Sequence, residues 1–252
     1  MSDLLIDIGN THFKWLLRGG EQAQRGVGSS GEDYDDAIGL LAASLGEVDR
    51  VGVACVKSQV YQQAMVAALQ RHFGVEPFVA CVSSDACGVV NSYTDPARMG
   101  VDRWLAMIAA RQRAAGAFCV VDCGSAVTFD WVGRNGRHIG GYIVAGLRLA
   151  VSSLLSGTDQ VIVDYDGLVD GRPEPGRNTT DAVYNGAVFS LVAQVEAAHQ
   201  SLCRLAGQSS AQLVLTGGDA GLVSRFLGCE AEVVDDLVFE GLEVMMNAAG
   251  DR

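Results

Sequence analysis

Two segments of the chain share one pattern, and this repeat restricts the folds that the chain can adopt. Residues 4–15 read LLIDIGNTHFKW, and residues 120–131 read VVDCGSAVTFDW. Each segment is an apolar run that reaches Asp, turns at a Gly two residues later, and resumes as a second run that ends in Trp. The two acids, Asp7 and Asp122, are separated by nearly half of the chain. The repeat therefore predicts two related halves, each with an acid and a tight loop suited to a phosphorylated ligand.

The periodicity of apolar residues predicts strands and helices in both halves. Strands are expected at residues 4–8, 13–17, 51–56, 77–82, 118–122, 127–132, 138–144 and 213–215. Helices are expected at residues 34–45, 61–73, 102–115, 180–206, 220–227 and 236–248. Asn135-Gly136 between two strand signals predicts a tight hairpin, because these residues readily adopt positive φ. Strand pairs followed by helices, occurring twice, favour an α/β fold with mixed sheets and two domains, residues 1–116 and 117–252.

Composition and charge exclude several classes of protein. Hydrophobic residues make up 49% of the chain and charged residues 19%, which is typical of a compact globular protein. The net charge is −12 without a cluster of Lys or Arg, which argues against nucleic-acid binding. We expect no membrane helix, because no apolar run approaches about 20 residues, and no secretory signal is visible. The seven cysteines form no CxxC pair, so we expect reduced thiols in the cytosol and no zinc site.

The first copy of the repeat combines groups that suit a nucleotide. Gly9 lets the backbone turn and approach a ligand, and the N–H groups after it can bind phosphate oxygens. Asp7 lies at the carboxyl end of a strand, where it can hold Mg²⁺ directly or through water. Lys14 on the second strand can reach a phosphate. The alternative is a plain β-turn in which Asp and Asn bond their own backbone.

The second copy, DCGSAVT at residues 122–128, allows the same two interpretations. Its repetition favours the functional one, in which the two loops enclose a polyphosphate. A further motif, TGGDA at residues 216–220, joins a strand to a helix and permits close approach of a ring or a ribose. Taken alone, this motif is better explained as the start of a helix with Asp219 as its cap.

Two other motifs carry polar or glycine residues at special positions. In MGVDRW, residues 99–104, Asp102 fits a helix N-cap, and the motif also fits a site in which Asp102 takes a proton while Arg103 holds an anion. In HIGGYIVAG, residues 138–146, the glycines indicate close packing against either a ligand or another backbone segment. The chain lacks GxxxxGK[ST], so a P-loop nucleotide site is not expected.

Five motifs in this order resemble those of the type III pantothenate kinases. They are DIGNT at 7–11, GVDR at 100–103, DCGSAVT at 122–128, GGYI at 140–143 and TGGD at 216–219. That family belongs to the acetate and sugar kinase/Hsp70/actin superfamily. The resemblance implies two ribonuclease-H-like (actin-like ATPase) domains with mixed sheets and an interdomain cleft. It also implies ATP-dependent phosphorylation of pantothenate to 4'-phosphopantothenate, the first step of coenzyme A biosynthesis.

The resemblance also implies roles for individual residues. Asp102 would accept the proton of the pantothenate hydroxyl. Asp122 would bind a monovalent cation, K⁺ or NH₄⁺, and Asp7 would hold Mg²⁺ through water. Residues implied to bind ATP are Asp7, Ile8, Gly9, Asn10, Thr11, His12, Phe13, Lys14 and Ser125. Residues implied to bind pantothenate are Tyr93, Gly100, Val101, Asp102, Arg103 and Thr179. The family resemblance further implies a cytoplasmic homodimer, with pantothenate near the dimer interface and without nucleic-acid or membrane partners.

The chain departs from the family pattern at three positions. Ser125 replaces the usual Thr and keeps the hydroxyl group. Ala145 stands where the family usually has Pro, and Ala150 where it has Met. Since Pro would fix φ, we expect a looser loop and weaker substrate binding, with activity retained.

Two alternatives to this function remain at the level of sequence. One is a catalytically silent homologue that acts as an accessory transcriptional regulator. The other is a kinase for a different small hydroxylated acid or sugar. Intact Asp7, Asp102, Arg103 and Asp122 argue against the first alternative.

Overall fold

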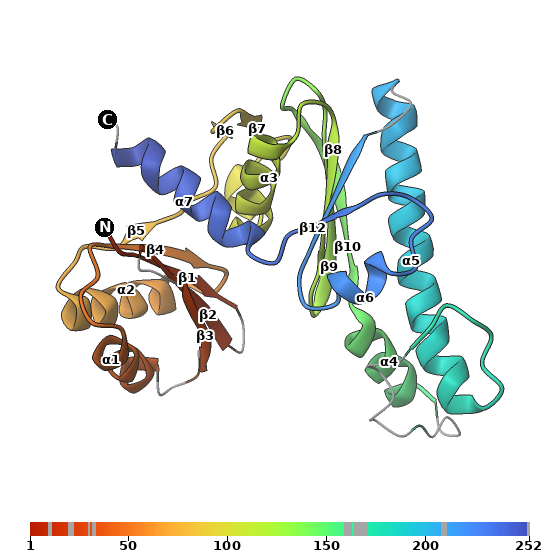
Figure 1. Cartoon of the computed structure of the whole chain (residues 1–252), viewed down its shortest axis with the longest axis horizontal. Coiled ribbons are helices and arrows are strands. Elements are labelled where there is room, and N and C mark those ends of the chain that lie inside the picture. The colour runs from red at the N-terminus through yellow and green to blue at the C-terminus, as the bar shows by residue number, and fades with distance from the viewer. Residues whose placement is uncertain are drawn as a thin grey trace. The chain divides into compact units, whose positions relative to one another are not determined.

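The computed structural model describes residues 1–9, 12–19, 23–29, 31, 34–158, 163, 171–207 and 211–250. The predicted ATP-binding residues Asn10 and Thr11 lie outside this set. The elements, labelled in Figure 1, are β1 (Asp3–Ile8), β2 (His12–Arg18), β3 (Gln24–Ser29), α1 (Tyr34–Leu45), β4 (Arg50–Cys55), α2 (Gln59–Phe73), β5 (Phe78–Val79), β6 (Asp85–Ala86), β7 (Val89–Val90), η1 (Pro96–Arg98), α3 (Val101–Arg113), β8 (Phe118–Cys123), β9 (Ala126–Val132), β10 (His138–Ala145), α4 (Leu147–Ser156), α5 (Thr179–Ala206), β11 (Gln212–Thr216), α6 (Ala220–Ser224), β12 (Glu232–Val233) and α7 (Leu237–Gly250).

The chain divides into two compact units, each built around a mixed sheet. The first unit contains Met1–Ala109 and Leu237–Arg252, and the second contains Ala110–Asp236. Within the described residues, the first sheet has the strand order β3-β2-β1-β4-β5 and the second has the order β10-β9-β8-β11-β12. In each sheet the central strand pairs antiparallel with the next strand in sequence and parallel with a later strand. The two sheets thus share one topology, which confirms the predicted α/β class and the repeat.

The first sheet is covered on both faces. Leu4, Ile6 and Ile8 of β1 pack in a core with residues of α1 and α2, which lie side by side. Leu5 of β1 packs in a separate core with residues of α3 and α7. Because side chains alternate along a strand, Asp7 projects to the same face as Leu5.

One face of the second sheet is covered in the same way. Cys119, Val121 and Cys123 of β8 pack with α4, α5 and α6, and Figure 1 shows α5 along that sheet. Asp122 therefore projects to the opposite face of β8, as Asp7 does in β1 with respect to the α1–α2 face. The two acids hold equivalent places in their units.

The C-terminal helix α7 belongs to the first unit, which differs from the predicted division at residues 116 and 117. The reason is packing: Phe239 and Leu242 of α7 lie in the core with Leu5 of β1. These residues are far apart in sequence, so no periodic pattern predicts their contact. At Gly241, a side chain would overlap the carbonyl of Leu105 in α3, so the two helices cross in close contact.

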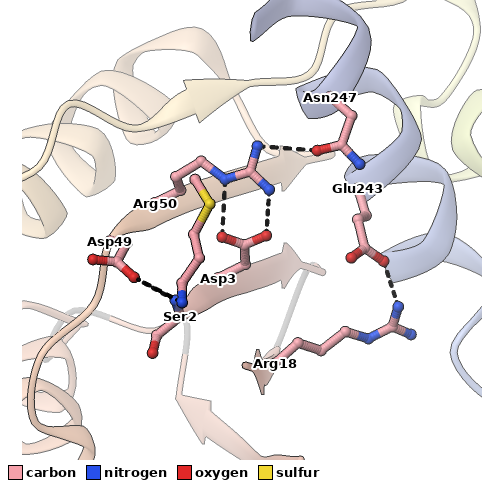
Figure 2. Close-up of polar contacts among 8 residues, drawn as sticks. Ser2, Asp3, Arg18, Asp49, Arg50, Glu243 and Asn247 are labelled. Carbon is pink, nitrogen blue, oxygen red and sulfur yellow. Dashed lines mark hydrogen bonds and ion pairs between the residues drawn. The ribbon is translucent and has the colours of Figure 1, made fainter. Parts of the chain in front are cut away.

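Polar contacts also hold α7 to the first sheet. Arg50 of β4 donates from Nε to Asp3 at 2.9 Å and from Nη1 to Asn247 of α7 at 3.0 Å. Arg18 of β2 forms an ion pair with Glu243 one turn earlier in α7. Figure 2 shows these contacts between the sheet and the helix.

Most other predicted elements are present, and the differences have local causes. The predicted strand at 77–82 pairs only at Phe78–Val79. Strand β3 was not predicted, because its sequence QRGVGS lacks apolar alternation. Its Gly26 and Gly28 leave room for the rings of Trp15 and Phe13 in β2, so packing rather than its own pattern specifies it. Helix α4 was also not predicted. Among the described residues, no helix has the length and apolarity required to cross a membrane.

Candidate functional site

The first unit holds Asp7 at the carboxyl end of its central strand. Asp7 pairs with Lys14 of β2 and with Ala54 of β4. Paired residues on adjacent strands project to one face, so Asp7 and Lys14 lie on the face covered by α3 and α7. Gly9 donates its N–H to the carbonyl of His12 at 3.0 Å, which joins the end of β1 to the start of β2.

The residues near this connection differ in what they can offer a ligand. The side chains of Ile8 and Phe13 are buried in the core between the sheet and α1–α2. They can contribute only backbone groups to an ATP site. His12 and Lys14 are exposed, so their side chains can reach a ligand.

The GVDR motif, residues 100–103, lies at the start of α3 in the same unit. Helix α3 begins at Val101, so Asp102 lies inside the first turn instead of at the N-cap. Oδ1 of Asp102 accepts a hydrogen bond from the N–H of Arg103 at 2.8 Å. A side chain at Gly100 would overlap this same oxygen, so Gly100 provides the space that the carboxylate occupies. The side chain of Val101 is buried in the core with α7.

Arg103 joins this cluster to Tyr93. Its side chain is only 6% exposed. Nη1 of Arg103 donates to the Tyr93 hydroxyl at 2.9 Å, and the guanidinium lies 5.7 Å from the centre of the tyrosine ring. Burying a cation is costly unless it is well bonded, so this guanidinium is held in a fixed position. The structure thus brings together Tyr93, Gly100, Asp102 and Arg103.

The second unit surrounds Asp122 with backbone. Asp122 pairs with Thr128 of β9 and with Thr216 of β11. The next residue, Gly217, has a φ of 90°, and a side chain there would overlap Oδ1 of Asp122. Asp219 donates its N–H to the carbonyl of Cys123 at 3.0 Å. The TGGDA loop is therefore packed directly on the second copy of the repeat.

Asp219 is a functional candidate that the sequence did not reveal. It occupies the N-cap position of α6, but within the described part of the chain its side chain makes no capping hydrogen bond. The structure thus confirms the predicted helix start with Asp219 at the N-cap position, but the side chain supplies no capping bond to the described residues. Burial raises the pKa of Asp219, and Arg148 at the start of α4 opposes that rise.

The carboxylates of Asp122 and Asp219 make the electrostatic potential around Cys123 negative. The pKa of Cys123 rises to about 12, first because of burial and then because of the charges of Asp122 and Asp219. Such a field disfavours a further anion at Cys123 and favours a cation.

The glycine-rich strand β10 leads to the same loop. Gly140, with φ 146°, lies where the β9–β10 register shifts. Gly146 donates its N–H to the carbonyl of Ser125 at 3.0 Å, and a side chain there would overlap the backbone of Gly124 and Ser125. Glycine is therefore needed at these two positions for the backbone conformation or for close contact with a neighbouring segment. Ser125 itself is exposed beside this contact.

Thr179 lies in a large pocket of the second unit. It is the first residue of α5, after the N-cap Asn178, whose Oδ1 accepts from the N–H of Asp181 at 2.8 Å. The pocket measures about 830 Å³ and lies between α4 and α5. Ala145 and Ala150, two of the three departures from the family pattern, also line it. These small residues therefore enlarge the space near Thr179.

Metal ligands in the described residues are sparse, since no group of three or more His, Cys, Asp or Glu side chains is placed to hold a metal ion.

Comparisons with known proteins agree with these features. The family model for type III pantothenate kinase matches residues 3–201. The type III pantothenate kinase of Chromohalobacter salexigens is 40% identical over 241 residues, covering 94% of this chain and 85% of that protein. The enzyme of Marinobacter nauticus is 37% identical and covers 97% of this chain and 98% of that protein.

Solved structures support the fold. A Campylobacter jejuni protein described as a Baf family transcriptional activator has a TM-score of 0.60 at 18% identity, covering 99% of this chain and 100% of that one. A Listeria monocytogenes protein described as an N-acetylmannosamine kinase has a TM-score of 0.53 at 12% identity, with full coverage of both chains, 100% each. At these identities the likeness concerns the fold alone. The full-length relatives and the family match show that the chain belongs to the type III pantothenate kinases, which catalyse the first step of coenzyme A biosynthesis.

Proposed function

We propose that Asp102 is the proton acceptor in the phosphorylation of pantothenate by this kinase. The observation that carries the proposal is the space at Gly100, which is filled by the Asp102 carboxylate beside the buried Arg103. A half-buried carboxylate in the same helical turn as a buried arginine suits a site where an anionic substrate binds and loses a proton. Arg103 and Tyr93 would hold pantothenate, and Gly100 would approach it through its backbone.

The reaction requires alignment and charge neutralisation more than covalent chemistry. As the pantothenate hydroxyl oxygen bonds to the γ-phosphorus of ATP, its proton passes to Asp102. The bond between the γ-phosphorus and the bridging oxygen breaks, and ADP leaves with that electron pair. A general base of this kind typically contributes about 10²–10⁴-fold to the rate.

The phosphates of ATP would bind at the first copy of the repeat. The Lys14 ammonium would donate to a phosphate together with the DIGNT motif, and the Ser125 hydroxyl would also contact ATP. Asp7 fits Mg²⁺ held through water, since a single strand-end carboxylate leaves most ligand positions to water and phosphate. When bound, Mg²⁺ would neutralise phosphate charge.

A monovalent cation, K⁺ or NH₄⁺, would bind at Asp122. The support is the negative field of Asp122 and Asp219, together with the adjoining backbone of Gly217 and Cys123. Carbonyl and carboxylate oxygens suit a hard cation. Thr179 would contact pantothenate from the 830 Å³ pocket.

We also propose that the enzyme works as a homodimer in the cytoplasm. Three contacting elements of the second unit expose large apolar side chains: Ile143 of β10 is 63% exposed, Leu149 of α4 53% and Phe189 of α5 60%. Strand β10 also lies at the edge of its sheet as described. Such a surface fits a second copy of the chain. All seven cysteines lie in the described part of the chain and are free thiols, which supports a reducing compartment.

Replacing the proton acceptor tests the central assignment. Asp102→Asn should lower kcat by about 10²–10⁴-fold, because the amide cannot accept the hydroxyl proton. The dissociation constant for ATP should stay within about twofold, since Asp102 is assigned to pantothenate alone. A coupled ADP-release assay with mass identification of 4'-phosphopantothenate measures the rate. Asp35→Asn, which removes the exposed ion pair with Arg71, is the charge-matched control. Wild-type turnover in Asp102→Asn would falsify the assignment.

The cation role of Asp122 predicts a specific change in ion dependence. Asp122→Asn should reduce activation by K⁺, because one negative charge is lost from the site. Activity is measured across a K⁺ titration at saturating Mg²⁺-ATP. Asp7→Asn serves as the matched comparison and should instead raise the Mg²⁺ concentration needed for half-maximal rate. An unchanged K⁺ response in Asp122→Asn rejects the role.

The dimer proposal predicts a change in mass. Phe189→Glu should convert a dimer into a monomer, since it places a charge in the apolar surface of α4, β10 and α5. Light scattering coupled to size exclusion gives the mass directly. Leu40→Glu, at a side chain 74% exposed on α1, is the control and should remain dimeric. A monomeric wild-type chain at micromolar concentration contradicts the proposal.

A further inference from the structure

One side chain, Asn91, holds the loop that carries Tyr93. The backbone N–H of Asn91 donates to the carbonyl of Ser84 at 2.8 Å. Its Nδ2 donates to the carbonyl of Ser83 at 3.4 Å and approaches the sulfur of Met99 at 3.7 Å. Its Oδ1 accepts the N–H of Tyr93 at 2.9 Å. Asn91 thus contacts three chain segments at once.

Two of these segments, at Tyr93 and at Met99, are the two ends of one loop. We call this loop, residues 93–99, the substrate loop. The bond from the Tyr93 N–H to an Asn side chain two residues earlier is an Asx-turn, which fixes the local backbone. At the other end, Met99 is buried and directly precedes Gly100. The residues between them include the η1 turn, Pro96–Arg98. Asn91 therefore closes the base of a loop whose two ends carry substrate groups.

The chain of hydrogen bonds continues from Tyr93 to helix α3, which carries Asp102 and Arg103. The Tyr93 hydroxyl accepts from Nη1 of Arg103 at 2.9 Å, and Arg103 follows Asp102 in the first turn of α3. Displacement of the Tyr93 backbone would move its hydroxyl, and with it the position at which the guanidinium is held. The strands β6 and β7 anchor the other side, since Ser83 and Ser84 precede β6 and Asn91 follows β7.

We propose that Asn91 is a positioning residue of the kinase site, which sets the distance between Tyr93 and the Gly100–Arg103 turn without touching the substrate. The inference rests on the proposed roles of Tyr93 and Arg103 in holding pantothenate. Asn is specific for this task because its amide donates to Ser83 and Met99 while its oxygen accepts from Tyr93. Asp keeps the acceptor and loses both donors, so it separates the two functions.

The test compares substrate affinity with catalysis. Asn91→Ala should raise the KM for pantothenate about tenfold, because both ends of the loop are released. The KM for ATP should change by less than about twofold, since no ATP group depends on this loop. Asn91→Asp should recover part of the pantothenate KM through the retained bond to Tyr93. Asn135→Ala is the matched control: Oδ1 of Asn135 accepts the N–H of Arg137 at 3.1 Å, the same contact in the β9–β10 turn.

A double-mutant cycle keeps the proposal testable if Asn91→Ala folds poorly. In a Tyr93→Ala background, Asn91→Asp should raise the pantothenate KM by a smaller factor than it does in the wild-type background, because one of the two groups whose separation Asn91 sets is gone. Tyr93→Ala alone is measured first, and an unchanged pantothenate KM there refutes the proposed role of Tyr93 itself. If Tyr93→Ala raises this KM while folded Asn91→Ala leaves it at the wild-type value, the positioning role is overturned. Fully additive effects in the cycle overturn it as well.

Discussion

Each sheet depends on a central strand that pairs antiparallel on one side and parallel on the other. The residues of β1 and β8 are buried almost throughout, so apolar side chains continue nearly to the carboxyl end of each strand. The polar side chain nearest that end is Asp7 in β1 and Asp122 in β8. The strand pairing therefore fixes where each acid lies.

The two acids occupy equivalent places, but their neighbours give them different chemistry. Asp7 is opposite the cation Lys14 on one side and Ala54 on the other. Asp122 is flanked by Thr128 and Thr216, and the backbone of Gly217 lies against its carboxylate. A lysine suits the phosphates of ATP, whereas hydroxyl-bearing neighbours and a second carboxylate suit a bare cation. The proposed proton acceptor, Asp102, belongs to neither copy and depends on the space at Gly100 and the support of Arg103, Tyr93 and Asn91.

The sequence predicted what local patterns determine. Apolar runs and the Asn135-Gly136 turn identified β1, β2, β8, β9 and β10, because burial and turn geometry leave a direct signature. Strand β3 was missed because its Gly26 and Gly28 lack the apolar pattern of a strand. Glycine is needed there because a side chain would overlap the rings of Trp15 and Phe13 in β2. The place of α7 with the first unit depends on contacts with residues far away in sequence, such as Arg50 with Asn247. The same holds for Asn91, whose importance lies in joining Ser83, Tyr93 and Met99.

The central claim is that the acids of the two copies of the repeat bind different ions, Mg²⁺ at Asp7 and a monovalent cation at Asp122. Anomalous diffraction from crystals grown with Tl⁺, Mn²⁺ and a non-hydrolysable ATP analogue tests it directly, since Tl⁺ substitutes for K⁺ and Mn²⁺ for Mg²⁺. The account predicts a Tl⁺ peak at the Asp122 carboxylate and a Mn²⁺ peak between Asp7 and the phosphates. A Tl⁺ peak at Asp7, or both ions at a single acid, would contradict it.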